Sequence, residues 1–504
     1  PLAWAAERLS RLAKAKSQRF TGPCSQSQKK ARRHREFLWE RHCCESDGLR
    51  FHWQVAAVPL ATKTGLRRDV AGGFCEPVVS RQSRLMSSVQ LTTHPPHPPS
   101  PAAPVLLLAL ALSLSAAISL GITRFSYGLL LPPMREDLGW SYTLAGAMNT
   151  ANAVGYLIGA LAMSRLVRRS APTRVLLWGS VLATLFMAAS GFFTAPAPLL
   201  VQRLLAGVAS ALVFSTGGLL AARLAAQQPH RSGFLLGLYY GGTGLGIVLS
   251  ALGVPLLLAW AAGQAHAWAW AWWGLAGLCA LATALLVWPA RVLAAQEAVA
   301  GGVAVVAGSG ATRPSDAMAT RVFRVRDFRF ALAGYACFGV GYIGYMTFVI
   351  ALLREQGSGA SAITVYFTLL GLAVMASSRI WAGLLDRHKS GRALALLNAL
   401  LGAATLLPAV TTAWPLVIAS GLLFGGVFLS VVASTTALVR HNLPPSQWVA
   451  GIGAFTVAFA AGQIVGPTVV GFIADGPGGL ARGLVFSAVA LWVGAGFAWR
   501  QRAL

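Results

Sequence analysis

Three arginines lie inside long apolar stretches of the sequence: Arg124, Arg203 and Arg379. At the centre of a lipid bilayer a charged side chain costs at least about 2.5–3.5 kcal/mol, so each is a functional candidate by default. A guanidinium group can bind a carboxylate or a phosphate through two parallel hydrogen bonds. Arg124 therefore predicts a site for an anionic group. The alternative is a structural arginine bonded to backbone carbonyls at a helix break.

Tyrosines in the same stretches offer an aromatic face together with a hydroxyl group. The candidates are Tyr127, Tyr239, Tyr240, Tyr342 and Tyr345. With Arg124 and Arg203 they form the predicted substrate-binding set, although any single tyrosine can instead serve packing. Asn149, Asn152 and Gln463 are weaker candidates, because amides also join neighbouring helices.

The residues that other kinds of chemistry need are missing from these stretches. No Asp, Glu or His lies well inside an apolar stretch, and Cys279 and Cys337 each stand alone. The sequence therefore predicts no catalytic residue, no metal and no cofactor, and hence no enzyme. The glycines of residues 237–246 follow no strand, which argues against a nucleotide-binding loop.

The composition is typical of a membrane protein. Of the 504 residues, 56% are hydrophobic and 11% are charged, whereas a soluble domain carries about 25% charge. The net charge of +26 is unevenly placed, because residues 1–103 hold 17 of the 41 Lys and Arg residues. We therefore expect no nucleic-acid partner.

Twelve apolar runs follow Pro104, each long enough to cross a hydrocarbon core, which takes about 20 residues. The expected spans are 104–131, 141–163, 175–193, 198–221, 232–258, 268–288, 330–352, 361–384, 393–411, 415–438, 449–473 and 481–499. Breaks are expected at Pro132-Pro133, at Pro289 and at Gly476-Pro477-Gly478. The predicted fold class is all-α integral membrane, with two six-helix pseudo-symmetric halves.

Basic residues between the spans favour one side of the membrane. Alternate loops hold eighteen of them, against three on the opposite side, Arg135, Arg354 and Arg482. Because basic loops stay in the cytoplasm, both termini are expected there. We expect a multi-pass protein of the bacterial inner membrane.

The longest hydrophilic stretch, residues 289–329, divides the spans into six and six. We expect a first half at 104–288, a cytoplasmic linker at 289–329 and a second half at 330–502. The basic loop at Arg165 recurs 222 residues on at Arg387. Paired halves of this kind place a solute site near the midplane between them.

Residues 1–103 show no sustained helical or strand period and are expected to be a disordered extension. Met86 is the hypothesised physiological start, which makes residues 1–85 translated upstream sequence. A basic tail that binds lipid head groups is the other interpretation.

Several motifs make the chain resemble the major facilitator superfamily. They are Gly383–Arg392 after span 8, with Asp386 and Arg387, Arg203-x-x-x-Gly207 in span 4 and Gly462-x-x-x-Gly466-Pro467 in span 11. A first copy of the loop motif has Met163 where the family has Asp. The string from Gly121 to Met134 is similar to the YbfB/YjiJ-type branch.

The resemblance implies a transporter that works by alternating access, with a cytoplasmic latch that opens and closes. The predicted gating residues are Arg165, Arg168, Arg169, Asp386, Arg387 and Arg392. Arg379 is expected at a gate or interface near the cytoplasmic surface.

We expect secondary active or facilitated transport of a small organic solute, with an anion favoured by Arg124. Efflux of amphiphilic or drug-like compounds and a transport-dead membrane sensor are the alternatives. The expected partners are a small-molecule substrate and the lipid bilayer, and the chain is expected to be monomeric.

Overall fold

The computed structural model describes residues 105–306 and 322–504, which fold into helices joined by short turns. The predicted extension at 1–103 and linker residues 307–321 lie outside the described residues. Within the described part, twelve helical segments are long and apolar enough to cross a membrane. The prediction of an all-α membrane protein with twelve spans is confirmed.

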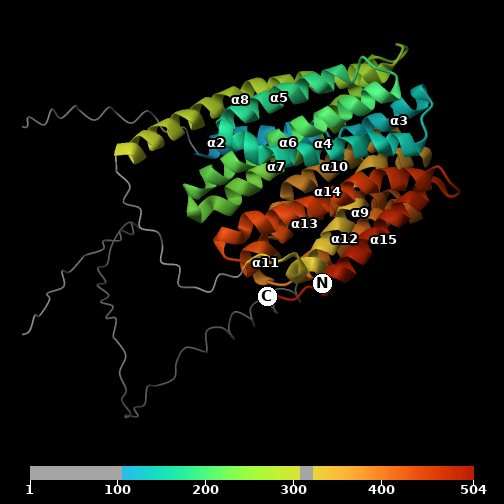
Figure 1. The fold of residues 1–504 in the computed structure, drawn as a ribbon. Coiled ribbons are helices and arrows are strands. Elements are labelled where there is room, and N and C mark those ends of the chain that lie inside the picture. The colour runs from blue at the N-terminus through green and yellow to red at the C-terminus, as the bar shows by residue number, and fades with distance from the viewer. Residues whose placement is uncertain (1–104, 307–321) are drawn as a thin grey trace, which may run out of the picture. The chain divides into compact units, whose positions relative to one another are not determined.

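The first span, Val105–Leu138, contains α2 (Val105–Ala116), a π-helical turn η1 (Ala117–Ile122) and α3 (Tyr127–Leu138), as Figure 1 shows in blue. The rest of the N-terminal half is α4 (Tyr142–Arg169), α5 (Pro172–Ala189), α6 (Pro196–Ala226), α7 (Ser232–Trp260) and α8 (Ala267–Val306). The C-terminal half is α9 (Arg329–Glu355), α10 (Ala360–Ile380) with the short α11 (Ala382–Arg387), α12 (Arg392–Val410), α13 (Trp414–Asn442), α14 (Trp448–Ala474) and α15 (Gly479–Trp499).

Two predicted breaks at proline are wrong. Pro132 and Pro133 lie inside α3, which continues to Leu138, and Pro289 lies inside α8, which continues to Val306. A proline removes one backbone hydrogen bond, and membrane helices tolerate this loss where neighbouring helices or local adjustments satisfy the freed carbonyl. The first part of the stretch expected to be a linker is therefore helical.

The two ends of the helix bundle differ in charge. At the end where α4 stops and α5 starts, which we call the basic end, lie Arg165, Arg168, Arg169 and Arg174. The opposite end, which we call the far end, carries the carboxylates Glu136, Asp137, Glu355 and Asp475.

Among the described residues, the backbones of the two halves lie close together in three helix pairs: α3 with α9, α4 with α14, and α7 with α10. At the far end the backbones of α4 and α14 meet so closely that a Cβ at Gly146 would collide with the carbonyl of Pro467. Toward the basic end, Gly453 has no neighbour within 4 Å and Ile158 is 48% exposed. The close backbone contact at Gly146 therefore lies in the far-end part of these two helices.

The third pair, α7 with α10, stays in contact near the basic end as well. A Cβ at Gly237 would lie 2.8 Å from the hydroxyl of Ser378, and the Arg379 guanidinium lies 4.8 Å from the ring centroid of Phe234. Arg379 therefore lies at an interface between the halves, as the sequence predicted.

Candidate substrate site between the halves

A break in the first span positions Arg124. After the π-helical turn, the N–H of Thr123 donates to the carbonyl of Ile118, and the N–H of Phe125 donates to the carbonyl of Leu120. Each nitrogen–oxygen distance is 3.0 Å. These bonds reach back five residues instead of four, which widens the helix before α3 begins. Such π-helical turns are frequent at functional sites, and broken spans line the solute sites of transporters.

Arg124 reaches from this break across to the C-terminal half. Its Nη2 donates to Oε1 of Gln463 on α14, and its guanidinium carbon lies 5.5 Å from the ring centroid of Tyr156. Arg124 is 2% exposed. Its Nε and the Nε2 of Gln463 are buried without a hydrogen-bond partner. One free donor from each half, the Nε of Arg124 and the Nε2 of Gln463, is therefore available to a ligand.

Arg203 of α6 is held from several sides. Its Nη1 donates to the carbonyl of Thr123 over 3.1 Å, and its Nη2 donates to Oδ1 of Asn149 over 3.0 Å. The guanidinium carbon lies 4.8 Å from the ring centroid of Tyr127 and 5.7 Å from that of Trp272. The arginine bonded to a carbonyl at the helix break is thus Arg203, and Arg124 is instead bonded to a side chain.

Amide side chains connect this cluster to both halves. Asn149 donates from Nδ2 to the hydroxyl of Thr347 on α9 over 2.7 Å. Asn152 donates to the carbonyl of Arg203 over 3.1 Å. A Cβ at Gly207 would collide with the carbonyl of Asn152, so glycine lets α6 approach α4 closely. This contact explains the Arg-x-x-x-Gly spacing, because the glycine sets the helix distance at which Arg203 meets Asn149.

Neither buried guanidinium group has a carboxylate partner among the residues that the structure describes. The ion pairs there are Arg223 with Glu297, His266 with Asp137, and Arg354 with Glu136. A buried charge without a counter-ion is costly. The cluster is therefore electrostatically complementary to an anion.

An aromatic surface lies beside the arginines. Tyr342 stacks with Phe338, Phe428 and Phe459 at centroid distances of 4.8, 5.2 and 5.4 Å. The ring of Phe428 also lies 5.6 Å from that of Phe125, the residue after Arg124. The C-terminal half thus supplies a face on which a planar or apolar group could pack.

The structure brings together only part of the predicted substrate-binding set. Arg124, Arg203, Tyr127 and Tyr342 belong to the cluster. Tyr240 is 36% exposed and packs against Tyr239 at 5.1 Å.

Two other predicted tyrosines bond elsewhere. The Tyr239 hydroxyl donates to the carbonyl of Phe214 over 2.7 Å. The Tyr345 hydroxyl contacts those of Tyr366 and Ser420 within the C-terminal half. Neither hydroxyl bonds to the arginines in this structure, and a substrate-binding role for Tyr239 and Tyr345 stays a prediction.

Sequence reasoning gave too little weight to one face of α4. Asn149, Asn152 and Tyr156 follow each other at helical spacing, three and four residues apart, and all three reach the arginine cluster. That spacing was a usable signal. Thr347 and Trp272 carried none, because single Thr and Trp residues are common in apolar spans.

The predicted gating residues lie at the basic end and form no ion pair within the described part of the chain. Exposed side chains are found at Arg165, Arg168, Arg169, Asp386, Arg387 and Arg392. Arg392 lies over the ring of Trp499 at 5.7 Å. Their gating role stays a prediction, and it concerns a state in which the basic end is closed.

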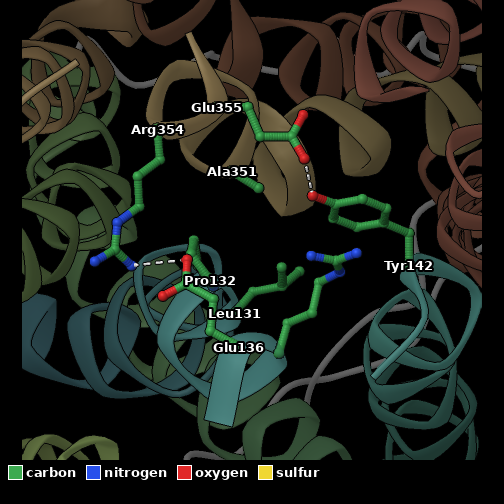
Figure 2. A pocket seen from close by; sticks show the side chains of 8 residues that line it. Leu131, Pro132, Glu136, Tyr142, Ala351, Arg354 and Glu355 are labelled. Carbon is green, nitrogen blue, oxygen red and sulfur yellow. Dashed lines mark hydrogen bonds and ion pairs between the residues drawn. The ribbon is translucent and has the colours of Figure 1, made fainter. Parts of the chain in front are cut away.

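The far end is closed by a different set of side chains, which the sequence did not indicate. Figure 2 shows the Tyr142 hydroxyl bonded to Glu355 and Arg354 paired with Glu136. The Nη1 of Arg354 lies 3.8 Å from the Oε1 of Glu136. The guanidinium carbon of Arg135 lies 3.8 Å from the ring centroid of Tyr142. These residues enclose a cavity of only about 120 Å³. The contacts of Tyr142 with Glu355 and of Arg354 with Glu136 join the two halves, whereas Arg135 and Tyr142 belong to the same half.

Asp475, at the end of α14, caps the start of α4 in the other half. It accepts from the N–H groups of Tyr142 and Thr143 over 2.7 and 2.8 Å and from the Thr143 hydroxyl over 2.6 Å. Partial burial raises its pKa, but these hydrogen bonds and the charge of Arg135 outweigh burial and leave the pKa below its ordinary value. A carboxylate at a helix N-terminus is also favoured by the helix dipole.

Twelve spans in two halves around a buried polar cluster define a membrane transporter of the major facilitator type. Residues 116–498 match the family described as "Uncharacterised MFS-type transporter YbfB", and the chain belongs to that family. It is not an enzyme.

Known proteins with related sequence or structure agree with this class. The chain is 27% identical over 397 residues to the "Chloramphenicol resistance protein" of Streptomyces lividans. The matched region covers 77% of this chain and 95% of that protein.

Two solved structures share the fold. The nucleoside transporter NupG matches with a TM-score of 0.58 and 12% identity, over 79% of this chain and 100% of its own. A bacterial homologue of the human lysosomal transporter Spinster, inward-facing and unoccupied, matches with a TM-score of 0.55 and 14% identity, over 79% of this chain and 96% of its own.

Proposed function

We propose that this transporter moves a small organic anion, bound between Arg124 and Arg203. The observation that carries the proposal is the pair of buried guanidinium groups with no carboxylate partner in the described structure. The anionic group of the solute supplies the missing charge. The unpaired Nε of Arg124 and Nε2 of Gln463 provide hydrogen bonds from opposite halves. The apolar part of the solute packs on the stack around Tyr342.

Transport then follows from rocking of one half against the other. With the basic end in the cytoplasm, the contacts of Tyr142 with Glu355 and Asp475 close the outer side. The predicted latch around Asp386 and Arg387 forms when the basic end closes. The protein works as a monomer in a bacterial inner membrane, because each chain contains both halves of the pathway.

A flux assay in proteoliposomes tests the proposal with pairs of solutes that differ only in charge, a carboxylate and its neutral amide. Wild-type protein should transport the carboxylate and discriminate against the amide. Arg124→Ala should abolish carboxylate flux. Arg482→Ala, which removes an exposed far-end arginine bonded only to the carbonyl of Pro477, is the control and should leave flux unchanged. Equal fluxes of carboxylate and amide would contradict the proposal.

Efflux of amphiphilic compounds is the second candidate, supported by the aromatic stack of Phe338, Tyr342, Phe428 and Phe459. The name of the Streptomyces relative also points to this activity. The variant Arg124→Ala distinguishes the two candidates, because a guanidinium group does not attract a lipophilic cation and its removal should not reduce efflux of that cation. If efflux of such a cation is the main activity and survives the substitution, efflux replaces anion transport.

A further inference from the structure

A second basic site lies at the basic end of the C-terminal half, away from the cluster between the halves. It is a cavity of about 870 Å³. The arginines that line it are Arg326, Arg329, Arg392, Arg500 and Arg502. The lining holds one acidic side chain, Asp327, and none of the five arginines is in an ion pair within the described residues. The described lining therefore carries more arginines than carboxylates, which leaves an excess of positive charge.

A buried glutamine fixes the frame of this cavity. Gln501 is 3% exposed, and its Nε2 donates to the carbonyl of Asp327 over 2.9 Å. Its Oε1 accepts from the N–H of Ala331 over 3.2 Å, and its carbonyl accepts from the N–H of Gly391 over 3.0 Å. The end of α15 is thus tied to the starts of α9 and α12. The preference for basic loops on one side explains that arginines occur here, but not that they converge on a fixed cavity.

An apolar surface leads from the membrane region of α15 to the cavity. Val485, Val489 and Trp492 share one face of α15 at four- and three-residue spacing and are exposed, and Trp499 lies two turns beyond Trp492 on the same face. Trp499, which lines the cavity, is 64% exposed and lies under the guanidinium group of Arg392. A tryptophan at the edge of a span is typical of the interface between acyl chains and head groups. The basic cavity and the apolar strip together match an amphiphile with an anionic head.

We propose that this cavity binds the phosphate head group of an anionic phospholipid whose acyl chains lie along α15. Arginine binds phosphate through paired, charge-assisted hydrogen bonds. Basic pockets between helices on this side of a membrane protein are suited to such head groups. Five arginines and the size of the cavity favour a head group with two phosphates, as in cardiolipin, over one with a single phosphate. The bound lipid joins α9, α12 and α15 at their basic ends.

Lipid binding to the purified full chain, measured by native mass spectrometry and by lipid-induced thermal shift, tests this site. Cardiolipin should bind wild-type protein more tightly than phosphatidylglycerol, and phosphatidylethanolamine should bind weakest. The triple variant Arg326→Gln, Arg500→Gln, Arg502→Gln should bind cardiolipin about 100-fold more weakly. The matched control is Arg168→Gln, Arg169→Gln, Arg174→Gln, which removes the same charge from the basic end of the other half and should change affinity less than about threefold.

The single variant Trp499→Ala keeps every charge, and its binding of a soluble phosphate shows whether the cavity is still folded. Trp499→Ala should weaken cardiolipin binding and leave the binding of inorganic pyrophosphate unchanged. Equal losses in the two triple variants would show general surface electrostatics and would overturn the proposal. Displacement of cardiolipin by equimolar pyrophosphate, with Trp499→Ala as tight as wild type, would also overturn it, since that result identifies a site for a soluble phosphate.

Discussion

Arg124 and Arg203 are chemically alike, but the protein holds them to different degrees. Arg203 donates to Thr123 and Asn149 and lies between two aromatic rings. Among the described residues Arg124 donates to Gln463 alone, and the Nε atoms of both arginines have no partner. We infer that Arg203 is mainly a positioning residue that fixes the helix break, and that Arg124 is the group left for the solute.

The difference predicts unequal losses of stability for two substitutions in the empty transporter. Arg203→Gln should lower the free energy of unfolding by about 1–3 kcal/mol, because the carbonyl of Thr123 and the amide of Asn149 lose a donor. Arg124→Gln should cost less, because only the Oε1 of Gln463 loses a donor, and both substitutions equally remove a buried charge that has no counter-ion. Thermal unfolding of the purified proteins without ligand measures both. A larger loss for Arg124→Gln would contradict this division of roles.

At the scale of elements, close helix contacts place the polar groups. Glycines at Gly207 and Gly146 let α4 approach α6 and α14 until backbones touch. The π-helical turn at Ala117–Ile122 breaks the first span where Arg124 is needed. The polar residues of α4 then lie between an arginine in its own half and Thr347 in the other.

Two glycines on α6 give a matched pair for testing this packing. Gly207→Ala should cost about 1–3 kcal/mol through overpacking, because the new Cβ collides with the backbone of α4. Gly218→Ala should be neutral or stabilising, because the nearest atom to its Cβ would be 3.6 Å away, on Tyr239. Thermal unfolding of both variants provides the comparison, and similar losses would show that the close contact does not matter.

The fold was predictable from the sequence because span length and the placement of basic loops depend on local composition. The site was predictable only in part. Arg124 and Arg203 were identifiable as charges in apolar runs, but Gln463 lies 339 residues from Arg124, and no local pattern reveals such a contact. Asp475 was not singled out by the sequence, because its role depends on the start of α4 in the other half.

At the scale of the whole molecule, closure of the far end depends on contacts between the halves. Asp475 accepts three hydrogen bonds from α4, and its lowered pKa means that the charged form is favoured by this contact. The contact is therefore complete above the ordinary pKa of an aspartate. It weakens as the pH falls through the lowered value.

Acidification should consequently open the far end. Spin labels at Thr194 and Thr412, in exposed far-end loops of the two halves, should move apart as the pH falls below the ordinary aspartate range. Asp475→Asn should shift the distance toward the open state at neutral pH and reduce its dependence on pH. Asp137→Asn is the control, because Asp137 bonds to His266 and Trp268 within its own half. Equal responses of the two variants would argue against Asp475 as the closing contact.

The central claim is that the two buried arginines bind an anion, and ligand-induced stabilisation measures this binding without requiring transport. A ligand at a hundred times its Kd raises the free energy of unfolding by about 2.7 kcal/mol. In a thermal-shift screen of matched carboxylates and amides, wild-type protein should be stabilised by at least one carboxylate and not by its amide. Arg124→Gln should lose that stabilisation. An amide that stabilises as well as its carboxylate, or a full shift in Arg124→Gln, would contradict the account.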